Sequence, residues 1–362
     1  MSTPIPQNSV AAATDSSQYA VVITGLGIAQ IFAWGSSYYL LAVLAKPIVR
    51  DTGWPFPWII GGVSLGLLVA GLVSPRVGRA IARYGGRPVL AISAILLAVG
   101  LALLGYAQSL PAYFLAWVII GLGMGAGLYD PAFATLGRLY GQAARPAITT
   151  LTLFGGFAST VCWPLSAYLV THLGWREACW SYAAIHLFVL VPLYLFALPR
   201  EVAFREPPPE PITGREGLVG DVGQGRNLNR VLFGLVAMAI TLSAMISTLV
   251  SVHLLTILQS RGLTLGAAVA LGALVGPCQV GARTIEFFIA RYHHPIWTKV
   301  VATSLVALGV VALWVSVPII ALSLVCYGAG IGLESIARGT LPLALFPGPQ
   351  YAVTMGRLAM PV

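Results

Sequence analysis

Ten long apolar stretches separated by short polar segments organise the sequence. Each has roughly the length, about 20 apolar residues, that a helix needs to cross the hydrocarbon core of a bilayer. The pattern therefore predicts an all-α polytopic membrane protein with about ten full spans. They cover approximately residues 19–45, 58–76, 88–107, 111–137, 147–171, 177–198, 229–253, 263–290, 297–316 and 318–343.

Two polar segments divide the chain further. Residues 1–18 are small and polar and contain no Lys or Arg, which predicts a disordered N-terminal tail. Residues 199–228 are rich in proline, glycine and mixed charge, a composition typical of linkers rather than of folded segments. We therefore expect an N-terminal half of six spans, residues 19–198, and a C-terminal half, residues 229–362, joined by a cytoplasmic linker.

A glycine-rich stretch in the fourth span returns in the tenth. With an offset of 205 residues, Gly123, Gly125 and Gly127 fall on Gly328, Gly330 and Gly332, and seven of the fifteen positions 123–137 are identical. The repeat predicts two duplicated halves, the construction of many transporters. By the same offset the second half would extend about 41 residues beyond residue 362. We expect a C-terminally truncated second half; a true ten-span protein is the alternative.

The composition supports a membrane protein. Hydrophobic residues make up 58% of the chain and charged residues 9%, against about 25% charged residues in soluble domains. The net charge of +9 reflects basic loops rather than a nucleic-acid partner. With a cytoplasmic N-terminus, thirteen basic residues, Lys299 among them, fall in inner loops and four in outer loops. This predicts an inner-membrane protein with its N-terminus in the cytoplasm.

The loop between the second and third spans reads GRAIARYGGRPVL, Gly78 to Leu90. It resembles the signature loop of the major facilitator superfamily, in which Gly78, Arg83, Gly85 and Arg87 match and Ala82 replaces the usual aspartate. The resemblance implies a fold of two pseudo-symmetric six-span halves and a conformational-switch role for this loop. In the family the aspartate supports the charge network that latches the halves, so Ala82 puts that latch in doubt.

Within the superfamily the chain resembles the oxalate/formate antiporter and monocarboxylate porter branch. The passages QIFAWGSSYYLLAVL, GPCQVGARTIEFF and MGRLAMP carry this resemblance. It implies that an arginine in the eighth span and a basic residue in the eleventh face a carboxylate substrate; these positions correspond to Arg283 and Arg357. Gln30 and Trp34 in the first span are deep enough to line the same cavity.

Charged side chains inside spans need a partner, a cavity or an escape to the surface, because burial in hydrocarbon is costly. Arg283 and Glu286 are three residues apart and Glu334 and Arg338 four apart, so each pair could neutralise itself within one helix. Alternatively, Asp130, Glu334 and Glu286 act in coupling or gating. Under the offset of 205, Asp130 corresponds to Ser335, which places Asp130 and Glu334 at pseudo-symmetric positions.

These observations predict a secondary active transporter that moves a small organic anion, a mono- or dicarboxylate, by alternating access. It would act as a monomer in the lipid bilayer, with a proton as a possible coupling ion. The alternatives are a proton-coupled exporter of drug-like compounds and an inactive truncated product. The sequence contains no motif of an enzyme, a cofactor site or a metal site.

Overall fold

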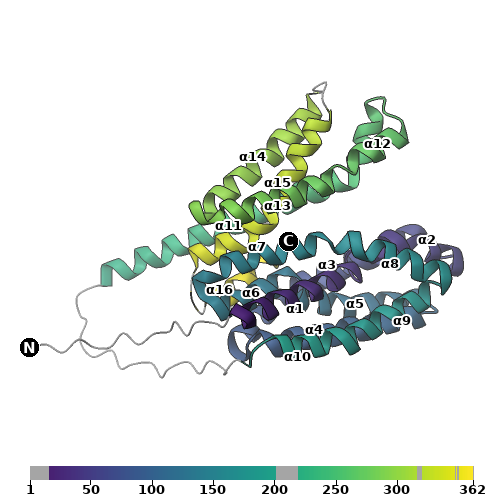
Figure 1. The fold of residues 1–362 in the computed structure, drawn as a ribbon, viewed down its shortest axis with the longest axis horizontal. Helices are drawn as coiled ribbons and strands as arrows, with labels where there is room; N and C mark the ends of the chain where they lie inside the picture. Colours follow the sequence, from purple (N-terminus) through teal and green to yellow (C-terminus); the bar gives the residue numbers. More distant parts are fainter. Residues whose placement is uncertain (1–15, 201–218, 316–319, 347, 349, 362) are drawn as a thin grey trace, which may run out of the picture.

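The computed structural model describes residues 16–200, 219–315, 320–346, 348 and 350–361, and within them the regular elements are all helices (Figure 1). Among the described residues, nine continuous segments are long and apolar enough to cross a membrane. One of them, Leu110–His172, has the length of two crossings joined by a tight turn, so together they agree with the ten predicted spans. Most of the predicted tail lies outside the described residues.

The N-terminal half has six crossings that alternate in direction. Their helices are α1 Ser16–Gly35 with α2 Leu40–Thr52, α3 Phe56–Tyr84, α4 Gly86–Tyr106, α5 Leu110–Gly127 with α6 Tyr129–Tyr140, α7 Ala144–Gly156 with α8 Ala158–His172, and α9 Trp175–Ile185 with α10 Val191–Ala197. A short 3₁₀ turn, Gly141–Ala143, reverses the chain after α6, and a π-helical turn, His186–Leu190, joins α9 to α10. The break between α1 and α2 is braced by a 2.7 Å hydrogen bond between Ser36 Oγ and His186 Nε2.

The C-terminal half supplies four further crossings and a short helix, α16. They are α11 Val219–Ser260, α12 Leu265–Gly272 with α13 Val275–Ile289, α14 Pro295–Trp314, α15 Ile320–Leu345 and α16 Gln350–Leu358. Residues 201–218 of the predicted linker lie outside the described residues. Residues 219–228 of the predicted linker form the first part of helix α11, and the apolar spanning segment of this helix begins at Arg230.

The glycines of the fourth and tenth spans allow close helix packing in both halves. A side chain at Gly121 or Gly125 would collide with the backbone of α3, and one at Gly328 or Gly332 with the backbone of α13. The matching contacts are therefore 207 residues apart. Gly123, in contrast, faces Leu97 of α4.

The offset of 205 predicted from sequence identity is therefore wrong by two residues. The contacts of two other glycines support the correction. Gly100 packs on Ala116 and Ile120 of the fourth span, and Gly309 packs on Ser323 and Tyr327 of the tenth, so the contacted residues are again 207 positions apart. Glycines recur at every second position of GLGMGAG, so identity alone could not separate the two registers. Two residues turn a helix by about 200°, which would have put the glycines on the wrong face. The corrected register pairs Asp130 with Ala337 instead of Ser335.

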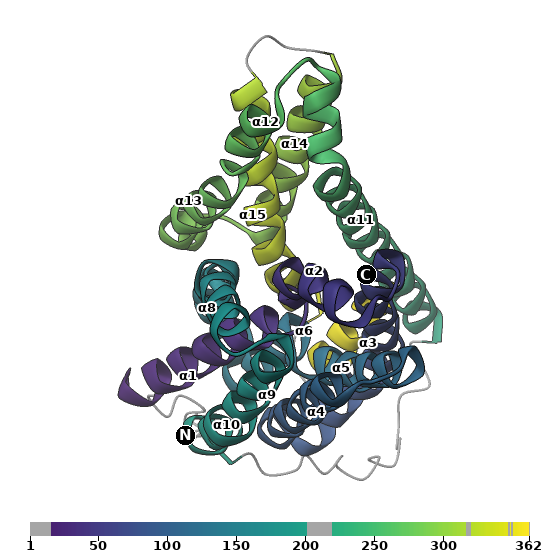
Figure 2. The ribbon, with the colours of Figure 1, turned by 90° about the vertical axis from the view of Figure 1, so that its right-hand side faces the viewer.

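The two halves contact each other near the end of the molecule where α1 begins and α10 ends, called the linker side below. There α16 packs against α3 and α6. A side chain at Gly78 would lie 2.5 Å from the Ala352 carbonyl, and one at Gly356 2.5 Å from the Ser74 carbonyl, so α3 and α16 cross backbone to backbone. At the opposite, far side, α12 and the end of α14 lie well away from α2 and α9 (Figures 1 and 2).

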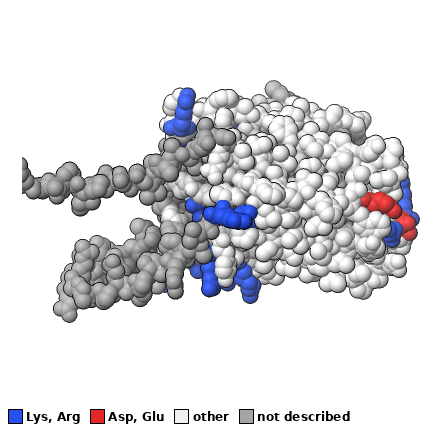
Figure 3. Space-filling model, turned by 60° about the horizontal axis from the view of Figure 1, so that its bottom comes forward, with Lys and Arg blue, Asp and Glu red and all other residues white. Residues whose placement is uncertain are grey.

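Charged side chains avoid the middle of the surface. On the face drawn in Figure 3, Lys and Arg gather toward the linker side, a small acidic and basic group lies at the far side, and the surface between them shows neither. This uncharged surface is the expected lipid-facing belt of a spanning bundle. The protein is therefore a multi-pass membrane protein.

Candidate binding site between the halves

Arg283 lies on α13 where this helix meets α7 of the other half. The side chain is 5% exposed. Its Nε donates to the Gly332 carbonyl of α15 at 3.3 Å, and its Nη1 donates to the Thr152 carbonyl of α7 at 2.9 Å. Gly156 makes this approach possible, because a Cβ there would lie 2.6 Å from Nη1. One guanidinium thus bridges the two halves through backbone carbonyls.

Aromatic side chains of the N-terminal half surround this guanidinium. Tyr129 contacts Arg283 and donates to the same Thr152 carbonyl at 3.4 Å. Its ring stacks on Phe133 at 5.2 Å and lies 5.0 Å from the ring of Trp34. Trp34 in turn packs edge-on against Tyr38. The predicted cavity residue Trp34 therefore belongs to an aromatic wall beside Arg283.

Gln30 has a supporting position in this wall. It is fully buried, its Nε2 donates to the Gly127 carbonyl at 2.7 Å, and its Oε1 accepts from Trp34 Nε1 at 3.1 Å. Both ends of the amide are thus engaged. Gln30 fixes the orientation of Trp34 and joins the first span to the end of α5.

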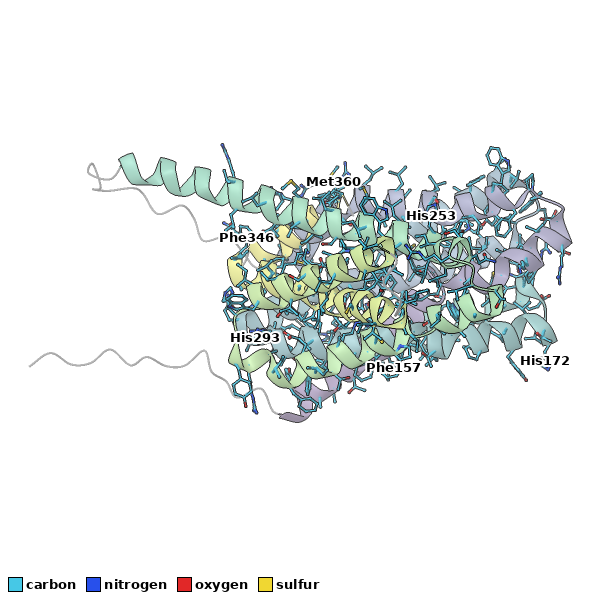
Figure 4. All side chains as sticks on the ribbon, turned by 90° about the horizontal axis from the view of Figure 1, so that it is seen from above. Phe157, His172, His253, His293, Phe346 and Met360 are labelled. Atoms are coloured by element: carbon cyan, nitrogen blue, oxygen red, sulfur yellow. The ribbon has the colours of Figure 1, made fainter. Side chains whose placement is uncertain are left out.

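The site lies between the two ends of the bundle. In Figure 4, Phe157, which follows Gly156 at the junction of α7 and α8, lies between His293 at the linker side and His172 at the far side. The junction is a helix interruption, since α7 ends at Gly156 and α8 begins at Ala158. Arg283 therefore sits at intermediate depth, where a charged side chain is costly to bury.

Asp130, in the first turn of α6, forms an ion pair with the other half. Arg338 of α15 donates to it twice, from Nε to Oδ1 at 2.9 Å and from Nη2 to Oδ2 at 2.7 Å. This is the forked geometry that makes arginine–carboxylate pairs strong. The predicted pair of Glu334 with Arg338 was wrong, because Arg338 binds a carboxylate across the interface.

Glu334 is engaged inside the C-terminal half. Its Oε1 accepts from Lys299 Nζ, which also donates to Ser243 Oγ at 2.9 Å. The other carboxylate oxygen, Oε2, is buried and has no hydrogen-bond partner among the described residues. Lys299 was predicted in an inner loop; it instead lies within α14, 8% exposed, because the helix begins at Pro295.

Glu286 is also bound by residues of other segments. It is 3% exposed, accepts from Thr298 Oγ1 at 2.7 Å, and lies 3.6 Å from Arg145 Nη2 and 3.4 Å from His293 Nε2. Arg145 also donates from Nη1 to the His293 carbonyl at 2.5 Å. The predicted pair of Arg283 with Glu286 was therefore wrong: Glu286 turns toward α7 and α14 at the linker side.

Arg357 does not join Arg283. It is exposed on α16, while its neighbours Met355, Gly356 and Leu358 are buried. The buried face of α16 packs against α3 and α6, and the Arg357 side chain lies on the opposite face. In this conformation the two arginines that the resemblance implies are not brought to one site.

The signature segment predicted as a loop is mostly helical, because α3 continues to Tyr84, α4 begins at Gly86, and Gly85 alone forms the turn. Gly85 has φ 85°, a backbone conformation that favours glycine. The Arg83 guanidinium lies 5.1 Å from the centre of the Tyr84 ring, and Arg87 Nε is buried without a hydrogen bond among the described residues. The Ala82 carbonyl, at the position of the usual aspartate, accepts from Arg138 of α6. A backbone oxygen thus contacts a basic residue at the position where the aspartate carboxylate of the family is absent.

Sequence reasoning missed several residues of these networks. Tyr129 precedes Asp130 and contacts Arg283, but its place in the sequence gives no sign of this contact. Arg145 and His293 lie near span ends and were not singled out, and Lys299 was predicted in an inner loop.

A family model decides the wider relationship. The model of the Major Facilitator Superfamily matches residues 26–360. The chain belongs to the Major Facilitator Superfamily. Membership in this superfamily points to solute transport rather than to an enzymatic reaction, and it agrees with the all-α fold of two similar halves.

Similar proteins of known name support this placement. Residues of the chain are 28% identical over 172 positions to monocarboxylate transporter 11 of Mus musculus, covering 46% of the chain and 36% of that protein. They are 29% identical over 181 positions to monocarboxylate transporter 13 of Bos taurus, covering 49% and 38%. The chain therefore spans little more than a third of the length of these curated relatives in the matched segments.

Solved structures of this superfamily share the fold. The human organic anion transporter MFSD10 (TETRAN) superposes with a TM-score of 0.66 at 17% identity, covering 95% of this chain and 90% of that chain. The transporter FucP in the outward conformation superposes with a TM-score of 0.67 at 14% identity, covering 95% and 89%. At these identities the likeness concerns the fold alone.

Proposed function

We propose that this superfamily member is a secondary active transporter that moves a small organic anion, a mono- or dicarboxylate, by alternating access. One observation carries the proposal. Asp130, Glu286 and Glu334 each have a basic partner, whereas Arg283 has none of the carboxylates of the described residues within salt-bridge distance. A buried arginine held by two backbone carbonyls and the Tyr129 hydroxyl, all of them neutral, retains an uncompensated charge, and a substrate carboxylate would compensate it.

The chemistry of the site fits such a substrate. A guanidinium offers a planar fork of donors that matches a carboxylate and remains charged at any relevant pH. The rings of Tyr129 and Trp34 beside it would pack against the organic part of the anion. The relatives named as monocarboxylate transporters and the structure named as an organic anion transporter agree with this class of substrate.

During the transport cycle the space between the two halves would close at the linker side and at the far side in turn. In the conformation described, Asp130–Arg338 and Arg145–Glu286 hold the halves together at the linker side, so the substrate would enter from the far side. Arg283 contacts both halves, which would let a bound anion favour their rearrangement. The signature loop with Gly78, Arg83, Gly85 and Arg87 would adjust as α3 and α16 separate.

Asp130 is the proposed coupling acid. A proton on its carboxylate would remove the charge that holds Arg338 and so release the linker-side closure. Glu334 and Glu286 would assist as gating residues through Lys299 and Arg145. The alternative of a proton-coupled exporter of drug-like cations requires unpaired carboxylates, and the pairing of Asp130 and Glu334 counts against it.

The proposed setting is the inner membrane, with the N-terminus and the linker side in the cytoplasm and the protein acting as a monomer. The basic residues at the linker side support this orientation by the positive-inside rule.

The direct test is transport by purified protein in vesicles of defined lipid. The compounds to be tested are lactate, pyruvate, oxalate, formate and a lipophilic amine. In each assay, vesicles would be preloaded with one unlabelled compound and given a trace amount of the same compound in labelled form. Accumulation of one or more carboxylates, competed by other carboxylates and not by the amine, would support the proposal. Accumulation of the amine without any carboxylate would favour the exporter instead.

A further inference from the structure

A groove of about 470 Å³ opens on the outer surface of the C-terminal half, between α13 and α14, and α15 forms its floor. Its volume lies within the range of about 300–1,000 Å³ typical of small-molecule sites. Ile285, Ile289, Val301 and Leu305 line it. Ile285 is 62% exposed, so the groove opens to the surroundings of the bundle and not to the space between the halves. It is therefore separate from Arg283.

The length of the groove matches one leaflet of a bilayer. It extends from His293, at the linker side (Figure 4), to Leu305 on α14. Leu305 lies ten residues after Pro295, where α14 begins, which is about 15 Å along a helix. Half of the hydrocarbon core of about 30 Å is the same distance. Trp297, 59% exposed at the linker-side end of the groove, has the position of an interfacial aromatic residue.

The linker-side end of the groove is basic. The turn between α13 and α14 contains Arg291, His293 and His294, and Arg145 reaches the same turn through the His293 carbonyl. The one carboxylate in the groove wall, Glu286, is engaged by Thr298 and faces Arg145 and His293. Its charge is therefore offset, and the exposed Arg291 adds a positive charge at headgroup level.

We propose that this groove binds an anionic phospholipid of the linker-side leaflet, with one acyl chain along α13 and α14 and the phosphate at the Arg291 turn. The apolar lining, the depth of one leaflet and the basic end together select this ligand over a zwitterionic lipid, because basic pockets between spanning helices attract anionic headgroups. The proposal does not depend on the transported substrate.

The test is native mass spectrometry of delipidated protein titrated with phosphatidylglycerol or phosphatidylcholine of identical acyl chains. The wild type is expected to retain at least one phosphatidylglycerol about tenfold more tightly than phosphatidylcholine. Val301→Trp, which fills the groove, should abolish this tight binding, whereas Leu308→Trp, on the same helix but outside the groove, should not. Arg291→Glu should remove the preference for the anionic lipid, and Arg230→Glu, an exposed arginine at the beginning of the membrane part of α11, should leave it.

Several results would overturn the proposal. Equal retention of the two lipids by the wild type would contradict an anionic site. Undiminished phosphatidylglycerol binding by a folded Val301→Trp protein would place the lipid elsewhere. Displacement of the lipid by oleate with no effect of Arg291→Glu would indicate a site for any acyl chain.

Discussion

Arg338 of α15 donates two hydrogen bonds to the carboxylate of Asp130 on α6, and this ion pair joins the two halves of the molecule near the linker side. Both side chains are partly exposed, with 26% and 17% of their surface accessible. The pair is therefore shielded enough from water to stabilise the contact between the halves. It is also exposed enough to break and re-form as the halves move.

Removing one partner of this pair should favour opening at the linker side. Breaking a fully buried pair costs about 3–5 kcal/mol, and partial exposure lowers this to about 2 kcal/mol, roughly a thirtyfold shift in a two-state equilibrium. In Asp130→Asn, a cysteine introduced at the buried linker-side position Ala352 should react faster with a polar maleimide. The reciprocal exchange Asp130→Arg with Arg338→Asp should return the rate toward that of the wild type. An unchanged rate in Asp130→Asn would show that the pair does not hold the closure.

Exchanging Glu334 and Arg338 should be strongly destabilising. The double variant places an arginine beside Lys299 and a glutamate beside Asp130, so it creates two buried repulsions in place of two attractions. We expect a loss of folded protein in detergent, measured by fluorescence-detected size exclusion and by the melting temperature. If Glu334 and Arg338 instead formed a self-contained pair within α15, the exchange would leave both measurements close to those of the wild type.

Gly156 should be needed for the position of the Arg283 guanidinium. Gly156→Ala would place a methyl group 2.6 Å from Nη1, so the guanidinium must move, and we expect carboxylate affinity to fall about tenfold with little loss of folded protein. Gly281→Ala, on the same helix as Arg283 and with nothing within 4 Å of its added Cβ, is the matched control. Equal affinities in the two variants would argue against this position of Arg283 in the substrate-binding state.

The orientation in the membrane can be tested with reporter fusions. A reporter at Arg87, in the first turn of α4, should report the cytoplasm, and one at Gly53, between α2 and α3, the opposite compartment. The physical reason is the excess of basic residues at the linker side. The reverse pattern would contradict the proposed orientation, although it would not affect the fold.

The sequence was sufficient for the fold because its signals are local. Apolar runs of spanning length predicted ten crossings, and the loop from Gly78 to Arg87 carried the resemblance to the superfamily. The register between the two halves and the partners of the charged side chains depend on contacts between distant segments, so local signals did not predict them. The glycine spacing of two residues left the offset between halves ambiguous until the faces toward α3 and α13 were known.

The ion pairs show the same limit. Spacing along one helix finds only partners on that helix, so it could offer only Glu286 to Arg283 and only Glu334 to Arg338. In the structure Glu286 pairs with Arg145, Glu334 with Lys299 and Asp130 with Arg338. Each pair joins two different helices, so spacing along one helix could not predict it. Arg283 has only neutral partners, two backbone carbonyls and Tyr129, and this finding depends on knowing where all three carboxylates point.

The central claim is that the uncompensated charge of Arg283 binds the carboxylate of the substrate. The most direct measurement is carboxylate flux into vesicles by the wild type, Arg283→Lys and Arg283→Gln at equal amounts of inserted protein, with Arg261→Gln, a half-buried arginine at the far side, as the control. We predict partial flux for the lysine variant, which keeps the charge but loses the fork, no flux for the glutamine variant, and wild-type flux for the control. Undiminished carboxylate flux in a well-inserted Arg283→Gln protein would contradict the account.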